Sequence, residues 1–306
     1  MKAVTVFAPA TVANIGPGFD AMGFAFEGIG DIVRMSLIPE NEIRYINLSG
    51  VELPTRNEDN LMTPALYAIM DNSGGRRGVE VKILQKIIPG SGIGSSAAAA
   101  AAAVYAYNAL IGSPFSDEEL VDFALEGEKM ASGSTHADNV APCLLGGVVL
   151  IRDYNPLDLV RIENKADIFV AVVHPHFEVR TKDARAVLPH ELSLPLAIRQ
   201  WANLGAMVAG MLQGNAKLIG RSLKDNVAEP YRKRFIPGYD QLKNDIMNCG
   251  ALGANISGSG PSVFALCDTI EVARAVNTVM EAHFVNLNIE CDIYASPICS
   301  LGCRVL

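Results

Sequence analysis

Hydrophobic and polar positions alternate in three stretches of the first part of the chain, over 4–8, 32–38 and 79–87. This period of two predicts strands with one buried face. Seven consecutive alanines at 97–103 break the alternation, and because alanine is the strongest helix former they predict a buried helix. A Ser-Asp-Glu-Glu capping box at 116–119 predicts the start of a second helix. The first half of the chain should therefore combine sheet and helix.

The second half shows a different order of elements. A polar stretch over 152–166, which contains Asn155-Pro156, suggests a domain boundary. The pattern beyond it predicts a strand, helices, a strand–turn–strand unit, a helix and a strand, which is typical of a ferredoxin-like sandwich with a helical insertion. We therefore predict an α+β protein with domains over 1–160 and 161–306. The elements of the second domain are expected at 168–173, 195–212, 216–227, 251–267, 270–284 and 288–295.

Composition excludes several classes of protein. The chain has 306 residues and a formal net charge of −8 without a long basic run, so non-specific nucleic-acid binding is not expected. The N-terminal residues alternate like a strand rather than a signal peptide. The alanine-rich segment is too short and too polar at its end to span a membrane. The six cysteines are scattered without a C-x-x-C pair, which favours reduced thiols in the cytoplasm.

The most informative motif is Pro-Gly-Ser-Gly-Ile-Gly-Ser-Ser at 89–96, between a predicted strand and the alanine helix. The free N–H groups and the positive dipole end of a helix N-terminus bind anions, most often phosphate. The motif is neither a Walker loop, which needs Gly-Lys-Ser/Thr, nor G-x-G-x-x-G. The alternative interpretation is a surface turn before a capped helix. The candidate phosphate-binding residues are Pro89, Gly90, Ser91, Gly92, Ile93, Gly94, Ser95 and Ser96.

Two further segments, at 9–20 and 256–262, combine glycine with Ser or Asn. Without a hairpin signal, such segments suit a backbone folded around a ligand, although each alone is also typical of an ordinary turn. Gly16-Pro-Gly18 matches part of the dinucleotide fingerprint, but a strand pattern rather than a helix follows it. A dinucleotide-dependent oxidoreductase is therefore the weaker interpretation.

The three segments together resemble the GHMP small-molecule kinases in order and spacing. They read Pro-x-x-x-Ala-Asn-x-Gly-x-Gly-Phe-Asp, Pro-Gly-Ser-Gly-Ile-Gly-Ser-Ser-Ala-Ala and Ser-Gly-Ser-Gly-Pro-Ser. Segments 132–147, 180–189 and 229–238 are similar to homoserine kinases, one family of that superfamily. The resemblance implies a GHMP kinase two-domain fold, with a ribosomal S5 domain 2-like N-terminal domain that binds ATP and a ferredoxin-like C-terminal domain.

The resemblance also implies an activity and an assembly. The expected reaction is ATP-dependent phosphorylation of the L-homoserine side-chain hydroxyl, a step of threonine biosynthesis, and the expected assembly is a homodimer. Two alternatives stay open at this point. One is a GHMP kinase that acts on another small alcohol, and the other is a non-catalytic nucleotide sensor of the same fold.

A site for homoserine, a zwitterion, needs a carboxylate for the ammonium group and guanidinium groups for the carboxylate. Asp20 is the candidate for the ammonium group, and Arg185 and Arg232 are the candidates for the carboxylate. Each also has a structural interpretation, such as a turn cap for Asp20 or a solvated surface for Arg232. The resemblance implies substrate contacts by Asn14, Asp20, His136, Asn139, Arg185 and Arg232, and catalytic roles for Asp20, Asn139 and Arg185.

Nucleotide and metal residues complete the expected site, with ATP and Mg²⁺ as cofactors. Glu128 lies four residues beyond Ala124 on the apolar face of its predicted helix, so its carboxylate points inward unless it reaches water at the helix end. The resemblance implies that Ser96 and Glu128 hold Mg²⁺. The proton acceptor stays open between Asp20 and the γ-phosphate or solvent. Further nucleotide contacts are implied for Asn60, Lys86, Thr181, Ser257, Gly258, Ser259 and Gly260.

Overall fold

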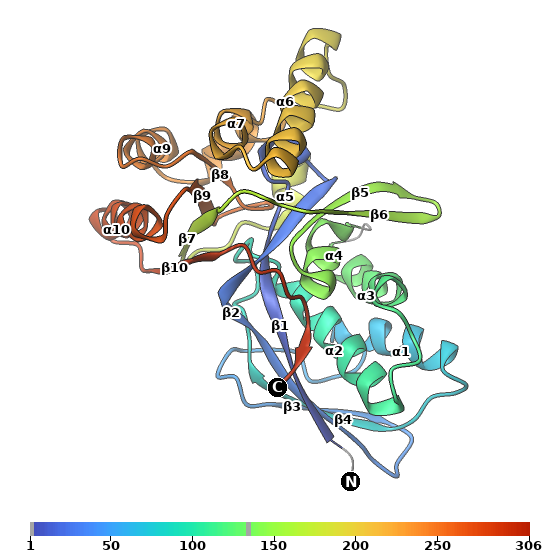
Figure 1. Ribbon diagram of the computed structural model, residues 1–306. Coiled ribbons are helices and arrows are strands. Elements are labelled where there is room, and N and C mark those ends of the chain that lie inside the picture. Colours follow the sequence, from blue (N-terminus) through green and yellow to red (C-terminus); the bar gives the residue numbers. More distant parts are fainter. Residues whose placement is uncertain (1–2, 133–135) are drawn as a thin grey trace.

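Strands from both ends of the chain build the sheet of the N-terminal domain (Figure 1). The computed structural model describes residues 3–132 and 136–306. The sheet has the order β11-β1-β2-β4-β3, with β5 paired to β2 and β6 paired to β5; β3 and β4 are parallel and the other pairs antiparallel. Its strands are β1 (Ala3–Ala13), β2 (Met22–Leu37), β3 (Ile43–Asn47), β4 (Val79–Gln85), β5 (Val148–Tyr154), β6 (Leu157–Ile162) and β11 (Arg304–Val305).

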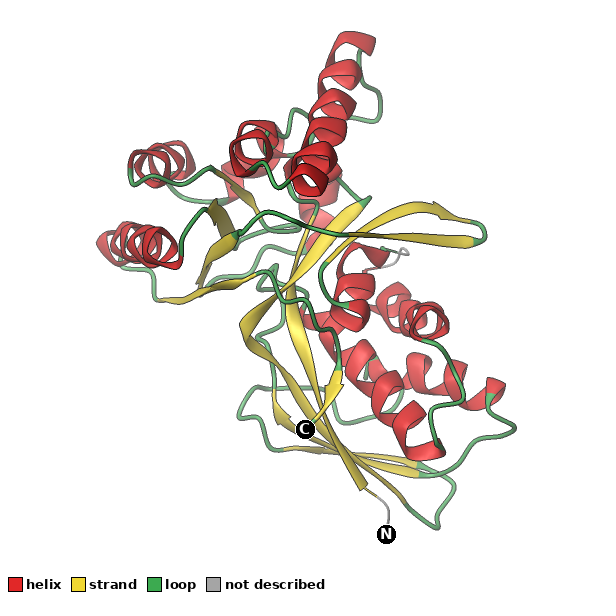
Figure 2. Cartoon of the chain, viewed as in Figure 1, coloured by secondary structure: helices red, strands yellow, loops and turns green. Residues whose placement is uncertain are grey.

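Helices α1 to α4 gather on one side of this sheet (Figure 2). The seven consecutive alanines at 97–103 in α2 are at most 1% exposed, and their small side chains let this helix pack against β1, β2 and the other helices at once. The predicted capping box is confirmed, because the Ser116 N–H donates to the Glu119 carboxylate at 2.8 Å and the Glu119 N–H donates back at 3.3 Å. The helices are α1 (Met62–Asn72), α2 (Ser95–Ile111), α3 (Asp117–Ser132) and α4 (Ala137–Leu145).

The second sheet has the order β10-β7-β9-β8, which is the strand order of a ferredoxin-like sandwich, as predicted. Its strands are β7 (Phe169–Pro175), β8 (Gly253–Ile256), β9 (Val263–Cys267) and β10 (Cys291–Pro297). The helical insertion between β7 and β8 is also confirmed, and α10 crosses from β9 to β10. The helices of this domain are α5 (Thr181–Ala186), α6 (Leu194–Gln213), α7 (Ala216–Ser222), α8 (Glu229–Arg232), α9 (Tyr239–Asn248) and α10 (Ile270–Asn286).

The polar stretch at 152–166 forms a hairpin rather than a linker. Strand β5 turns at Asn155-Pro156 into β6, so the predicted boundary at residue 160 falls inside a strand. The error has a physical reason, since a hairpin with much of its surface in water is as polar as a loop. We place the crossing into the second sheet after Ile162, and the strand β11 returns to the first sheet.

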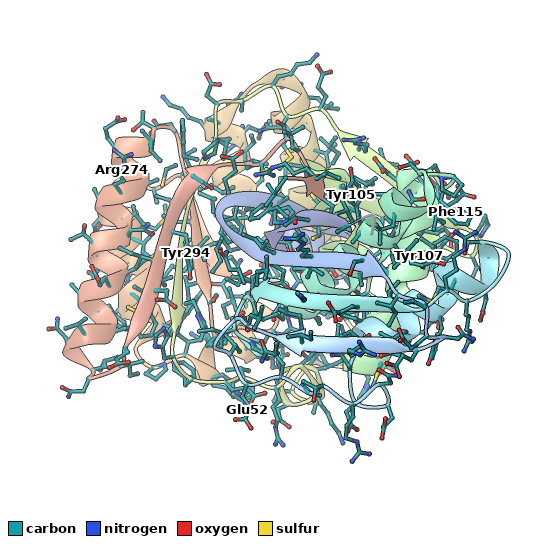
Figure 3. All side chains as sticks on the ribbon, turned by 90° about the horizontal axis from the view of Figure 1, so that it is seen from below. Glu52, Tyr105, Tyr107, Phe115, Arg274 and Tyr294 are labelled. Atoms are coloured by element: carbon teal, nitrogen blue, oxygen red, sulfur yellow. The ribbon has the colours of Figure 1, made fainter. Side chains whose placement is uncertain are left out.

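The two sheets share one hydrophobic core. Phe24 of β2 meets Phe264 of β9 edge to face, with ring centroids 6.0 Å apart, and both rings are fully buried. The ring centroids of Tyr294 in β10 and Phe26 in β2 lie 6.3 Å apart, and Figure 3 shows Tyr294 where the two sheets meet. Arg274 projects from the outer face of α10. Burying one such ring stabilises the joint by about 2–3 kcal/mol. Loops from both domains are therefore held in a fixed relation.

Within the described part of the chain, none of the helices has the length and apolarity that a membrane crossing needs.

Candidate active site

The middle and third glycine segments pack directly on each other at this joint. The Ser257 hydroxyl donates to the Gly92 carbonyl at 2.7 Å, and the Ser262 hydroxyl donates to the Ser91 carbonyl at 2.6 Å. Both serines are fully buried. The C-terminal domain therefore supports the back of the loop that leads into α2.

The first glycine segment joins the same cluster. The Asn14 side-chain amide donates to the Gly258 carbonyl at 3.0 Å, and its oxygen accepts from the Asp20 N–H at 3.0 Å. The Thr11 N–H donates to the Ile93 carbonyl at 3.1 Å. Segments that are far apart in the sequence are thus fixed against one another, as the ligand-binding interpretation of these motifs requires.

Glycine is needed in the middle loop for steric reasons. Gly94 has a φ of +76°, and a Cβ there would stand 2.0 Å from the Thr11 hydroxyl oxygen. A Cβ on Gly92, whose φ is +79°, would stand 2.6 Å from the Gly260 carbonyl oxygen. Because the backbone runs this close to its neighbours, the loop turns sharply into the N-terminus of α2. The first N–H groups of α2 are the groups that bind anions at a helix N-terminus.

The three segments line one cavity of about 630 Å³. The cavity lining includes every predicted site residue except Ser91, Ile93, Ser257 and Gly260. Those four lie behind the surface, and Ser91, Ile93 and Ser257 are completely buried. Their part in the structure is to hold the loops together rather than to face the cavity.

Asp20 and Arg185 form an ion pair at one end of the site. Both terminal nitrogens of Arg185 donate to the two carboxylate oxygens of Asp20, at 2.9 and 3.0 Å. The hydrogen bonds to Asp20 raise the pKa of Arg185, so the guanidinium stays charged. The sequence predicts that these two residues bind opposite poles of one substrate, and in the structure they contact each other.

Arg232 lies beside the Phe19 ring, as Arg185 does, and is only 4% exposed. Its Nε donates to the Ala184 carbonyl at 3.2 Å, and its Nη1 donates to the Gly258 carbonyl at 2.6 Å. The guanidinium carbons of Arg232 and Arg185 lie 5.1 and 5.6 Å from the centroid of the Phe19 ring. Burial lowers the pKa of Arg232. This arginine is therefore part of the built site and not of a solvated surface.

The start of α4 supplies the remaining polar groups. His136 occupies the N-cap position, and burial lowers its pKa, which favours the neutral imidazole at pH 7. Asn139 accepts a hydrogen bond of 2.7 Å from the Thr11 hydroxyl, so its orientation is fixed by β1. Both residues line the cavity, and His136 lies close enough to Asp20 and Arg185 to feel their charges.

At the start of α2, the Ser96 hydroxyl donates to the Glu128 carboxylate at 2.8 Å. Glu128 is 7% exposed, and both residues face the cavity. Hydroxyl and carboxylate oxygens are the ligands that Mg²⁺ prefers. The donor set therefore fits the metal that the sequence analysis placed here.

Lys86 and Asn60 have clear structural partners as well as a place in the cavity wall. The Lys86 ammonium group lies 2.9 Å from the fully buried Asp31 carboxylate and donates to the Ser95 carbonyl and hydroxyl at 2.7 Å each. Asn60 accepts from the Met62 N–H at 3.0 Å, at the start of α1. Both residues therefore hold the elements that form this part of the cavity wall.

Comparison with known proteins identifies the family. The family models for the GHMP kinases N terminal domain and the GHMP kinases C terminal domain match residues 60–147 and 207–286. A homoserine kinase of Chlorobaculum tepidum is 44% identical over 320 residues, which cover 100% of this chain and 99% of that protein. The chain belongs to the homoserine kinase family of the GHMP kinases.

More distant relatives and solved structures agree. A homoserine kinase of Pyrococcus abyssi is 36% identical, with 94% of this chain and 95% of that protein covered. The crystal structure of homoserine kinase from Cytophaga hutchinsonii has a TM-score of 0.96 and 44% identity, with 100% and 98% covered. The L. major mevalonate kinase, at 18% identity and a TM-score of 0.74, shares the fold. The expected GHMP kinase two-domain fold is confirmed, and the chain is a phosphotransferase that uses ATP.

Two further residues had no assignment from the sequence: Asp138 in the cavity wall and Phe19 beside the two arginines. Asp138 is 3% exposed, and burial, together with the charges of Asp20 and Glu128, raises its pKa to about 7. Phe19 provides the ring shared by the two arginines. The signal for Asp138 was its position between His136 and Asn139, but nothing in the sequence shows that its carboxyl group is buried.

Proposed function

We propose that this chain transfers the γ-phosphoryl group of ATP to the side-chain hydroxyl of L-homoserine. The products would be O-phospho-L-homoserine and ADP, in a step of threonine biosynthesis. The observation that carries the proposal is the grouping of Asp20, Arg185 and Arg232 around Phe19, in the same cavity as the glycine loop at the start of α2. Two homoserine kinases that match over 99% and 95% of their length support it.

The charged end of the cavity suits the zwitterion. Each oxygen of the Asp20 carboxylate accepts one hydrogen bond from Arg185 and keeps a lone pair for the substrate ammonium group. A guanidinium group has five N–H donors, so Arg185 retains donors for the substrate carboxylate while it is paired. Arg232 adds a second positive charge close to the first. In the absence of substrate the pair neutralises itself, which limits the cost of holding charge in a half-buried site.

The nucleotide end of the cavity suits a triphosphate. The loop at 90–96 and the N-terminus of α2 offer backbone N–H groups to the phosphates. Ser96 and Glu128 would hold Mg²⁺, which when bound neutralises negative charge on the β- and γ-phosphates. Gly258 and Ser259 close the cavity from the C-terminal domain. These groups position the γ-phosphoryl group toward the charged end.

In the transfer step the homoserine hydroxyl oxygen bonds to the γ-phosphorus, and the bond from that phosphorus to the β–γ bridging oxygen breaks. The hydroxyl proton passes to a γ-phosphate oxygen or to solvent. Asp20 is a poor acceptor, because Arg185 and the substrate ammonium group together use the lone pairs of its two oxygens. Phosphoryl transfer passes through a loose transition state, so positioning and charge neutralisation supply most of the rate enhancement.

The proposal is tested by a coupled ADP-release assay with Mg²⁺-ATP. L-Homoserine is compared with L-serine, L-threonine, mevalonate and galactose at equal concentrations. Turnover that is selective for homoserine is the expected result. Selective turnover of another alcohol would reject the substrate assignment, and tight ATP binding without turnover of any of the five would indicate a nucleotide sensor.

We further propose a homodimer in the cytoplasm. The similarity to homoserine kinases supports the dimer, and the cysteines support the location, since all six lie in described residues and are free thiols. Sedimentation at several protein concentrations tests the dimer. A monomer at all of them would reject it.

A further inference from the structure

A cluster of two histidines and one aspartate lies at the end of the second sheet, apart from the residues that line the cavity. His174 lies in β7 and is paired in register with Asp292 of β10. His176 follows two residues after His174, and its N–H continues the strand pairing by donating to the Glu290 carbonyl at 2.7 Å. Because side chains two residues apart in a strand point to the same face, both imidazoles meet Asp292 on one face of the sheet.

The spacing of the three side chains matches that of metal ligands. One oxygen of Asp292 lies 2.9 Å from Nε2 of His176 and 3.7 Å from Nδ1 of His174. The ligand atoms of the three residues all lie within 4.8 Å of one another. Two ligands of a tetrahedral ion with bonds of 2.0–2.2 Å are about 3.4 Å apart. Small side-chain rotations would therefore bring all three atoms to one ion.

The residues around the two histidines also suit a metal site. Nδ1 of His176 lies 3.7 Å from the Glu290 carboxylate, on the opposite side of the ring from Asp292. A histidine that binds a metal through one nitrogen commonly donates its other N–H to a carboxylate, which fixes its tautomer. His174 is 3% exposed and is held by the paired strands, so one ligand is positioned in advance.

We propose that His174, His176 and Asp292 form a binding site for a divalent transition metal ion such as Zn²⁺. Two imidazole nitrogens and one carboxylate oxygen suit Zn²⁺ and its neighbours in the first transition row, whereas Mg²⁺ prefers oxygen ligands alone. The site is therefore chemically different from the Ser96–Glu128 pair. Three protein ligands leave a fourth position for water or another donor.

The site is also connected to the catalytic cavity through the chain. Two residues after His176, the side chain of Glu178 lies against Gly90 of the phosphate loop, and residues 178–182 line the cavity up to the start of α5. An ion bound to His176 would restrain the beginning of this segment.

The test is calorimetric titration of the whole protein with Zn²⁺ in excess Mg²⁺, which keeps oxygen-ligand sites filled. We expect one saturable site per chain. Loss of a ligand should weaken binding more than the 10–100-fold that is typical when an outer carboxylate is lost. Asp292→Asn and His176→Gln test the exposed ligands, and Glu290→Gln tests the outer carboxylate. His190→Gln and Cys291→Ser are matched controls, because His190 is exposed elsewhere and Cys291 is the thiol next to Asp292.

Titration with Co²⁺ identifies the ligands directly. A thiolate ligand gives an intense near-ultraviolet charge-transfer band, and a site made of two histidines and a carboxylate gives only weaker visible bands. The proposal is overturned if the unaltered protein shows no saturable binding, or if binding survives in both Asp292→Asn and His176→Gln. Loss of binding in Cys291→Ser, with a charge-transfer band in the unaltered protein, would also overturn it.

Discussion

Replacing Asp138 by asparagine should change how the stability of the protein depends on pH. The pKa of the buried Asp138 carboxyl is raised from 3.8 to about 7, chiefly by burial. A raised carboxyl pKa means that the folded state holds the proton more tightly than the unfolded state. The resulting loss of stability is absent below about pH 4, grows as the pH rises toward 7, and is complete above 7.

The size of the effect follows from the shift. About three pKa units at 1.36 kcal/mol per unit give a total of about 4 kcal/mol above pH 7. About two of those units lie between pH 5 and pH 7. The asparagine side chain has nearly the same shape as aspartate but does not titrate. On going from pH 5 to pH 8, it should therefore gain about 3 kcal/mol of unfolding free energy relative to the unaltered protein.

Urea unfolding of both proteins at pH 5 and pH 8 measures this difference. All other titrating groups are shared by the two proteins, so their contributions largely cancel in the comparison. A difference in unfolding free energy that is the same at both pH values would show that the Asp138 carboxyl is solvated. A difference that moves in favour of aspartate at pH 8 would refute the sign of the argument.

Three further changes test other parts of the cavity. Arg232→Ala should raise the KM for homoserine about ten- to hundredfold through the loss of charged hydrogen bonds, while ATP binding survives. Replacement of the exposed Arg234 by alanine is the control. A collapse of ATP affinity in Arg232→Ala would contradict the assignment of Arg232 to the homoserine site. Glu128→Gln should raise the Mg²⁺ requirement of the ADP-release assay about tenfold and lower kcat, and unchanged turnover would remove Glu128 from the metal site. Gly94→Ala should lower the unfolding free energy, measured by urea unfolding, by about 1–3 kcal/mol more than Gly112→Ala does. Both glycines have a positive φ, but only at Gly94 would the new Cβ meet neighbouring atoms. Equal losses in the two variants would mean that the loop can move aside.

The sequence was sufficient for the elements whose signal is local. The alanine run and the capping box at Ser116 appear where the pattern placed them, and the strand predicted at 79–87 is observed at 79–85, because each depends on neighbouring residues. The two-residue strand β11 could not be predicted, since a segment this short is a strand only through its pairing with β1. Helix α1 was also missed, although its start carries a local signal, since the Asn60 side chain accepts a hydrogen bond from the Met62 N–H.

For the site as well, the sequence predicts which residues take part but not which contacts they make or how deeply they are buried. Residue types and motifs predicted that Asp20, Arg185 and Arg232 belong to one site, and all three line the cavity. The bidentate pairing of Asp20 with Arg185 depends on contacts across more than 160 residues of chain, which a single sequence does not encode visibly. Burial of Asp138 is likewise a property of the packed fold, so its raised pKa has no counterpart in the motif.

The last strand of the chain has a consequence for synthesis on the ribosome. Strand β11 closes the edge of the first sheet, with Val305 opposite Val6 and the Leu306 N–H donating to the Thr5 carbonyl at 2.9 Å. An uncovered edge strand can pair with other chains. Because β11 follows every strand of the second sheet in the chain, the edge of the first sheet at β1 stays open until the C-terminal domain has been synthesised.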